Sequence, residues 1–384
     1  MPLPLPTADE ASLRRLIDAA RSDACAVNDV GVLARHLAAS GIQLQWPSMR
    51  TSDVASTGGP GSLSTLLPPL ALAAAGRSVV KLAVPGRPAG AIDTLGTVPG
   101  YRTRLQAEDV RAIIASCGFA HFLADERFAP LDAQLFALRK RLNAVAVPVL
   151  AIASLLSKKL AVGVQEVGLD VRVGRHGNFG VTRDAARENA RMFCLVARTV
   201  GIEAIAFLST PDEVPQPWIG RGESLLALAS AIGARPIEDS WLQEHVDDCL
   251  RMAGAISTPT RSLRHVLEQH LQSQGSSMHR FLERVDEVSN TERVPIYSDD
   301  AGILEIDLAR VRDVLVKAQA DSVATFRDSA GVHLLARPGR VVKKRDVLAS
   351  VRGLHGESLN ELAAAFSIVG GSPRDVVAME IVHA

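Results

Sequence analysis

An alternation of strand-like and helix-like segments in the middle of the chain constrains its fold most. Residues 166–173 are rich in Val and Leu and are typical of a buried strand. Residues 182–199 follow with the spacing of a helix, and residues 203–208 form a second apolar strand. This order predicts the α/β fold class, with a sheet covered by helices on both faces.

The flanking segments indicate how the rest of the chain is organised. Residues 11–41 and 128–162 show helical spacing, and we expect Pro148 to break the second segment. Residues 272–293 are polar and charged and suggest a flexible surface connection, whereas 322–352 contains short strands broken by turns. We therefore predict a small all-helical domain from 1–46 and 128–162, a large α/β domain from 47–127 and 163–321, and a β-rich C-terminal subdomain at 322–384.

Charge and composition argue against several function classes. Lys plus Arg number 42, as do Asp plus Glu, so the chain lacks the basic excess of a nucleic-acid binder. No signal peptide is visible at the N-terminus, and the most apolar stretch, residues 66–75, is short and contains two prolines. We expect a cytoplasmic protein with no nucleic-acid partner and no membrane association.

Cysteine and histidine spacing predicts no metal site. The four cysteines are far apart without a CxxC pair, and the histidines show no H-E-x-x-H pattern. We expect His265 and His270 to be solvated on a polar helix. His176 is the one histidine of interest, since it lies in the glycine-rich sequence GRHGNFG, although an ordinary loop histidine fits equally.

A glycine-rich loop at residues 56–62, STGGPGS, is a candidate anion site. Glycine permits the backbone conformations that let N–H groups converge on an anion, and a following helix start adds positive potential. Hydroxyl groups of Ser56, Ser62, Ser64 and Thr65 supplement these donors. Taken alone, the loop suits equally well a tight turn capped by Ser62.

Several motifs occur in the order found in the thymidine (pyrimidine-nucleoside) phosphorylase family. The loop resembles that family's KHSTGGVGD, and it is also similar to the GTGGD of anthranilate phosphoribosyltransferases, which lack the ALR and SKK motifs. The resemblance implies the fold of nucleoside phosphorylases and phosphoribosyltransferases. The other matching segments are PGRPAGAIDTLGTVPGY (85–101), FAPLDAQLFALRK (128–140), AIASLLSKK (151–159), LDVRVG (169–174) and AGVHLLARPGRVVKKRDVLA (330–349).

The resemblance implies that Arg139, Ser154 and Lys158 bind the pyrimidine base, with Arg139 and Lys158 as catalytic residues. Negative charge moves onto the base when the glycosidic bond breaks, so cationic donors stabilise the transition state. Ser154 and Lys158 are four residues apart and share one face of a helix. Without the resemblance, a solvated Lys158, a surface Arg139 and a buried helical Ser154 would explain the same residues.

The phosphate half of the motif set departs from the family. The family's Lys and His before STGG are Val54 and Ala55 here, and its Ser before GRG is Pro85. A buried phosphate needs a cation, so another residue must replace the lysine. The candidates are Lys81, Arg87, Arg172, Arg175 and His176. The acceptor-binding residues we predict are Ser56, Thr57, Gly58, Gly59, Ser62, Thr65 and Arg87.

The resulting functional hypothesis is a pentosyltransferase that cleaves a pyrimidine nucleoside by phosphorolysis. It needs no cofactor, with inorganic phosphate as co-substrate, and the resemblance implies a homodimer. Two alternatives stay open. The enzyme is a hydrolase or a base or sugar transferase that acts on a pyrimidine nucleoside or nucleotide without free phosphate, or the chain is a non-catalytic nucleoside-binding relative.

Overall fold

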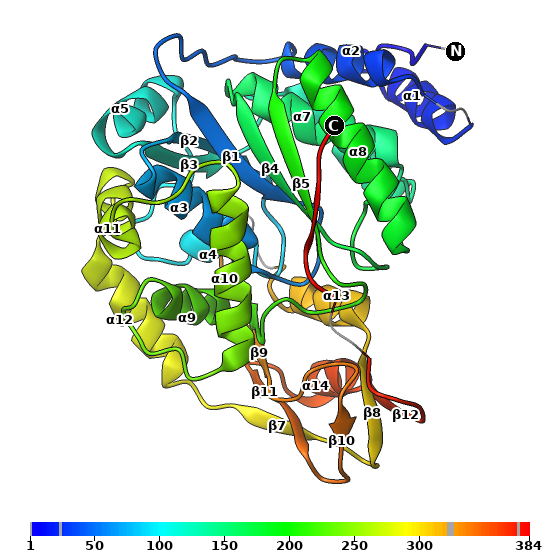
Figure 1. The fold of residues 1–384 in the computed structure, drawn as a ribbon, viewed down its shortest axis with the longest axis vertical. Coiled ribbons are helices and arrows are strands. Elements are labelled where there is room, and N and C mark those ends of the chain that lie inside the picture. The colour runs from blue at the N-terminus through cyan, green and yellow to red at the C-terminus, as the bar shows by residue number, and fades with distance from the viewer. Residues whose placement is uncertain (1, 23–24, 321–325, 375–376) are drawn as a thin grey trace.

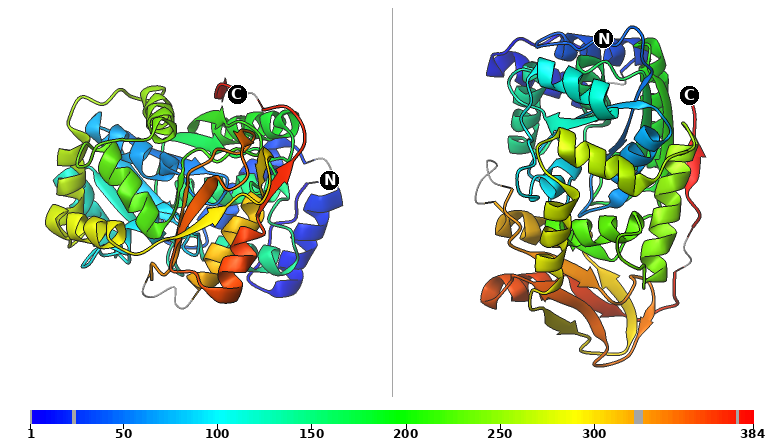
Figure 2. Two further views of the ribbon diagram at one scale, coloured as in Figure 1. Left: turned by 90° about the horizontal axis from the view of Figure 1, so that it is seen from below. Right: turned by 90° about the vertical axis from the view of Figure 1, so that its left-hand side faces the viewer.

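The computed structural model describes residues 2–22, 25–320, 326–374 and 377–384 (Figure 1). The N-terminal helices lie at one end of an elongated molecule and the C-terminal strands at the other, with the main sheet between them (Figures 1 and 2). Residues 322–325, where we expected the C-terminal subdomain to begin, fall outside the described ranges.

A central parallel sheet confirms the predicted α/β class. In the described part of the chain it has six strands in the order β13-β5-β4-β1-β2-β3, and only β13 runs antiparallel to its neighbour. The strand β4 is buried along its whole length, as a central parallel strand with both faces covered must be. The strands are β1 (Thr51–Ser56), β2 (Ser78–Ala83), β3 (Phe119–Leu123), β4 (Glu166–Val171), β5 (Glu203–Leu208) and β13 (Glu380–Val382).

Helices cover this sheet and connect its strands. The helix α3 packs against β1 and β2, and α8 packs against β5. Thr182 caps α8, since its hydroxyl accepts from the Ala185 N–H at 3.3 Å. These helices are η1 (Leu63–Thr65), α3 (Leu67–Ala74), α4 (Ala91–Leu95), α5 (Ala107–Cys117), α8 (Arg183–Thr199), α9 (Arg221–Ala231), α10 (Ser240–Gly254), α11 (Leu263–Ser273) and α12 (Met278–Ser289).

Segments far apart in the sequence form the helical end of the molecule. The helices are α1 (Glu10–Ser22), α2 (Val27–Ala38), α6 (Pro130–Arg141) and α7 (Pro148–Ala161). The helix α2 packs along α7 (Figure 1). The expected break at Pro148 is confirmed, because α7 begins there with proline at its first position.

The C-terminal strands form two small sheets around a core of their own. Buried Leu304, Val311 and Val332 belong to this second hydrophobic cluster. Apart from β6, which comes from residues 218–220, these strands begin at Val294, well before residue 322, and β13 returns to the central sheet. The elements are β6 (Trp218–Gly220), β7 (Val294–Tyr297), β8 (Gly302–Ile306), α13 (Leu308–Ala318), β9 (Gly331–Leu334), β10 (Val341–Val342), β11 (Val347–Arg352), α14 (Gly356–Ala363) and β12 (Phe366–Val369).

Two expectations for the segment around residue 280 are wrong. Residues 272–293 are not a flexible connection, because α12 buries Phe281 and Val285 completely. Their four-residue spacing gives one apolar face to an otherwise charged helix. His270 is not solvated either: it is fully buried, and its ring nitrogens contact Tyr101 Oη at 2.8 Å and the Phe119 carbonyl oxygen at 2.9 Å.

Candidate active site

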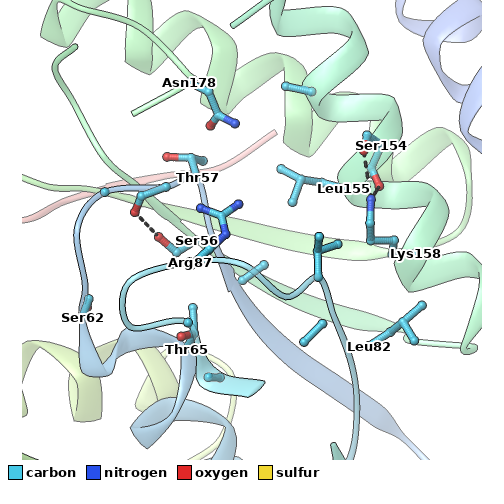
Figure 3. Close-up of a pocket in the computed structure, with 18 of the residues that line it drawn as sticks. Ser56, Thr57, Ser62, Thr65, Leu82, Arg87, Ser154, Leu155, Lys158 and Asn178 are labelled. Carbon is cyan, nitrogen blue, oxygen red and sulfur yellow. Dashed lines mark hydrogen bonds between the residues drawn. The ribbon is translucent and has the colours of Figure 1, made fainter. Parts of the chain in front are cut away.

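A pocket lies where the glycine-rich loop after β1 faces α6 and α7 (Figure 3). The end of β2 and the loop that follows it complete the lining, and Phe136 and Leu155 supply apolar surface. The structure brings all the predicted site residues to this one pocket. They are Ser56, Thr57, Gly58, Gly59, Ser62, Thr65, Arg87, Arg139, Ser154 and Lys158.

Lys158 is held in place by neighbouring oxygens on the α7 side of the pocket. Its Nζ donates to the Ser154 carbonyl oxygen and to Ser154 Oγ, both at 2.9 Å (Figure 3). Lys158 also forms an ion pair with Asp132. Burial lowers the pKa of Lys158, while the Asp132 carboxylate opposes that shift. The pair therefore keeps an ammonium group in a largely buried place.

Arg139 lies at the pocket but is already partly engaged. Its guanidinium donates to the carbonyl oxygens of Ala144 at 3.2 Å, Val145 at 2.6 Å and Leu150 at 3.2 Å. The side chain is only 1% exposed, and burial lowers its pKa to about 10. In this conformation Arg139 braces the connection between α6 and α7 and has only part of its donor set left for a ligand.

The glycine-rich loop has the backbone that its sequence predicts but fewer unused N–H groups. Gly58 and Gly59 have φ angles of 130° and 91°, where other residues are strained. The Thr57 N–H donates to the Asp170 carbonyl oxygen at 3.0 Å, and the Gly59 N–H donates to that of His176 at 3.2 Å. The loop amides alone therefore make a weaker anion site than the sequence suggests.

The Ser62 hydroxyl is used by contacts within the protein, which corrects its predicted role as an anion donor. Its hydroxyl accepts from the Ser64 N–H at 2.9 Å and from Arg172 Nη2 at 2.6 Å, and lies 2.9 Å from His245 Nε2. These contacts use the hydroxyl's full capacity as donor and acceptor. The alternative of a turn capped by Ser62 describes this residue better.

Three of the five candidate cations cannot offer a positive charge to a ligand in the pocket. Arg172 is buried in an ion pair with Asp170 and does not line the pocket. Arg175 is exposed, also outside the lining. His176 is buried, and burial lowers its pKa to about 4, so it is neutral near pH 7.

Lys81 lines the pocket floor but shares a carboxylate with a second lysine. Lys81 Nζ lies 2.9 Å from Asp53 Oδ1, and Lys159 binds the other oxygen of Asp53. All three side chains are buried, and the two lysines hold the pKa of Asp53 below its ordinary value although burial opposes this. Because two lysines share one carboxylate, the cluster gives this part of the pocket lining a net positive charge. Sequence reasoning missed Lys159, although it follows Lys158 in the SKK motif.

Arg87 is the cation that this geometry leaves available. Its guanidinium has no hydrogen-bond or ion-pair partner within the residues that the structure describes, and Figure 3 shows it between the loop and α7. A Cβ atom on Gly58 would lie 3.7 Å from Arg87 Nη1, so the guanidinium lies beside the loop. Asp93 Oδ1 and Oδ2 accept from the backbone N–H groups of Gly86 at 2.8 Å and Arg87 at 3.3 Å, which fixes the Arg87 backbone.

A second feature that the sequence did not predict is Asn178, which lines the pocket from the loop after β4. Its Oδ1 atom is buried and has no hydrogen-bond partner among the described residues. Over the same ranges, no three His, Cys, Asp or Glu side chains gather as they would around a metal ion. No described helix combines the length and apolar character needed to span a membrane.

Comparison with known proteins found relatives at low identity. No protein-family model matches the chain. Thymidine phosphorylase of Rattus norvegicus is 29% identical over 283 residues, which cover 71% of this chain and 58% of the relative. The Homo sapiens enzyme of that name is 30% identical over 234 residues, 59% of this chain and 48% of the relative.

The thymidine phosphorylase of Mus musculus is similar, with 30% identity over 233 residues. The chain spans about half the length of these relatives. Among solved structures, anthranilate phosphoribosyltransferase from Saccharomyces cerevisiae gives a TM-score of 0.43 at 15% identity, over 73% of this chain and 83% of that one.

Proposed function

We propose, from the premise that this chain is a divergent member of the thymidine phosphorylase family, that it cleaves pyrimidine nucleosides by phosphorolysis. Arg87 and the glycine-rich loop hold inorganic phosphate, and α6 and α7 hold the base. The products are the free base and a pentose 1-phosphate.

One observation carries the proposal: an unpaired guanidinium and a carboxylate-held ammonium face one pocket from opposite sides. Arg87 lies beside the glycine-rich loop, and Lys158 lies on α7 (Figure 3). No Asp or Glu is among the residues that line the pocket. Such a pocket attracts an anion on one side and stabilises charge that develops on the other.

The chemistry follows from these positions. A phosphate oxygen held beside Arg87 attacks C1′ of the sugar while the bond between C1′ and the base nitrogen breaks. The bonding electron pair moves onto the pyrimidine ring, where Lys158 and Ser154 stabilise the charge before the base takes up a proton. Arg139 adds its remaining N–H groups to this side. Positioning and charge supply most of the rate, because no covalent enzyme intermediate is needed.

Phosphate-dependent release of free base from uridine tests the proposal. The Arg87→Ala variant should raise the KM for phosphate at least about tenfold, since a charged hydrogen bond contributes about 1.5–3 kcal/mol. Arg87→Lys should recover part of this loss. Arg175→Ala is the matched control, because that arginine is exposed and outside the pocket.

A second candidate, hydrolysis or transfer without free phosphate, is favoured by Val54 and by the two engaged loop amides. The same assay separates the two functions. Base release that is equally fast without phosphate supports the second candidate and contradicts ours. Nucleoside binding without any release supports a non-catalytic relative.

A further inference from the structure

The segment that carries Arg87 has no regular secondary structure of its own. The strand β2 ends at Ala83 and α4 begins at Ala91, and the residues between them, 84–90, include two prolines and two glycines. Holding such a segment in one conformation costs conformational entropy, which contacts with the rest of the protein must offset. Arg87 therefore depends on outside contacts to keep its guanidinium beside Gly58.

The Asp93 carboxylate supplies contacts of this kind. Its Oδ1 accepts from the Gly86 N–H at 2.8 Å, and its Oδ2 accepts from the Arg87 N–H at 3.3 Å. A Cβ atom on Gly90 would lie 2.7 Å from Asp93 Oδ2 and 3.3 Å from Arg87 Cβ, so the segment folds closely around the carboxylate. Because Asp93 binds the backbone of Arg87, the half-buried side chain stays available in the pocket (Figure 3).

Arg221, the first residue of α9, pairs with this carboxylate. Its Nη2 lies 3.1 Å from Asp93 Oδ1, and the Asp93 side chain is completely buried. Burial raises the pKa of Asp93, while the charge of Arg221 opposes that shift and favours the carboxylate form. An ionised carboxylate accepts hydrogen bonds at both oxygens, as the two backbone N–H groups require.

The same guanidinium connects the Arg87 segment to other parts of the fold. Arg221 Nη1 donates to the carbonyl oxygen of Arg327, which precedes β9 in the chain. The helix α9 also packs against α4, which carries Asp93. The pair therefore anchors the segment to elements that supply none of the described residues in the pocket lining.

We infer that Asp93 and Arg221 are positioning residues, which hold the backbone of Arg87 so that its guanidinium binds the acceptor phosphate beside the glycine-rich loop. This inference rests on the proposed function, in which Arg87 is the phosphate-binding cation. Neither Asp93 nor Arg221 lines the pocket, so both act through Arg87. A charged hydrogen bond depends on the position of its donor, and a displaced guanidinium binds phosphate less well.

Equilibrium binding of inorganic phosphate to Asp93→Asn tests the inference. The change keeps the shape of the side chain but removes its charge, so the contacts with the two N–H groups and with Arg221 weaken. We expect the dissociation constant for phosphate to rise about threefold or more, but no further than in Arg87→Ala. The dissociation constant for uridine should stay the same, because Lys158 lies on a different element, α7. Asp18→Asn, at an exposed residue of α1, is the control and should bind phosphate as the wild type does.

A double variant separates positioning of Arg87 from a general effect on the fold. If Asp93 acts through Arg87, Asp93→Asn should cause no further loss of phosphate binding in a protein that already carries Arg87→Ala. An equal further loss in that background overturns the inference, as does a phosphate affinity that Asp93→Asn leaves unchanged. If Asp93→Asn does not fold, Arg221→Lys takes its place, because it keeps the charge but loses the fork that reaches both Asp93 and Arg327. Phosphate binding should weaken there too, and unchanged binding overturns the inference.

Activity measured on the same proteins separates failure of this inference from failure of the proposed function. Phosphate binding that depends on Asp93, without phosphate-dependent release of uracil from uridine, leaves the inference standing and overturns phosphorolysis. Phosphate-dependent release with the same KM for phosphate in the wild type and in Asp93→Asn overturns the inference alone. A wild type that binds no phosphate overturns both.

Discussion

Asp132 determines the charge state of Lys158, the residue that we propose to lie next to the base. Its carboxylate is 1% exposed and pairs with Lys158, whose pKa burial alone would lower further. The ammonium form of Lys158 stabilises negative charge on a departing base, whereas the neutral amine does so poorly. Asp132 is therefore a positioning residue that also keeps Lys158 charged.

The first prediction concerns Asp132→Asn. Removing the carboxylate takes away the interaction that raises the pKa of Lys158, so this pKa should fall. Lys158 then loses its proton at lower pH, and the alkaline limb of the kcat/KM profile should move to lower pH. The profile is measured from pH 6 to pH 10. An alkaline limb that does not move would show that Lys158 does not act through its charge.

The order of motifs predicted ten of the residues that line the pocket, but it did not predict Lys159 or Asn178, nor how the side chains are paired. Ser62 was predicted as an anion donor, yet its hydroxyl is used by His245 and Arg172, which are 183 and 110 residues away in the chain. Spacing cannot reveal such long-range contacts. For the same reason the sequence listed Arg87 among five cations without indicating that, of these five, it alone both lines the pocket and lacks a partner among the described residues.

At the level of elements, a buried carboxylate joins the C-terminal strands to the main body. Glu223 on α9 accepts two hydrogen bonds from Arg352 on β11, each 2.9 Å, and one from Arg293 at 2.9 Å. The Glu223 side chain is fully buried, so removing either arginine would leave its charge less compensated and would destabilise the fold.

The second prediction follows from this pairing. Arg352→Met should lower the free energy of unfolding by about 3 kcal/mol, because it leaves Glu223 and Asp328 with fewer partners. Chemical denaturation measures the loss, and Arg340→Met at an exposed residue is the control. A loss equal to that of the control would contradict a stabilising role for this junction.

His270 gives the contact between α11 and β3 a dependence on pH. Burial lowers its pKa from 6.5 to about 4. Between these values the unfolded chain binds the proton and the folded chain does not. The contribution of neutral His270 to the free energy of unfolding is therefore complete above about pH 6.5, and it is lost as the pH falls toward 4.

The third prediction is that His270→Gln flattens this decrease. The wild type should lose up to about 3 kcal/mol through His270 across the window, and the variant should lose that much less. Buried His176 and half-buried His333, with pKa values lowered to about 4, keep part of the slope. Denaturation curves at pH 7 and pH 4.5 measure the difference. Equal slopes in both proteins would exclude this contribution.

Elements with regular apolar patterns were predicted from the sequence, and those with polar interiors were not. The strand β1 was not predicted from the sequence, because Thr51, Ser52 and Asp53 are polar, yet all three are buried. Their side chains are satisfied by distant partners such as Glu166, which accepts from Ser52 Oγ at 2.6 Å. The strand β3 was missed because a five-residue apolar run with His121 at its centre does not identify a strand by periodicity.

At the scale of the whole molecule, the pocket exists only because the fold joins separate parts of the chain. The loop after β1, the segment after β2, the helices α6 and α7 and the loop after β4 each supply part of its lining. The sides that we propose for the base and for the acceptor thus belong to different elements of the helical end and the central sheet (Figure 1). Cleavage requires both sides to hold their ligands at once.

Phosphorus NMR of the protein with uridine and inorganic phosphate tests this central claim most directly. The account predicts a new pentose 1-phosphate signal that grows in step with free uracil, and that is strongly reduced in Arg87→Ala. Uracil release without any sugar phosphate, or no reaction at all in a folded protein that binds uridine, would contradict it.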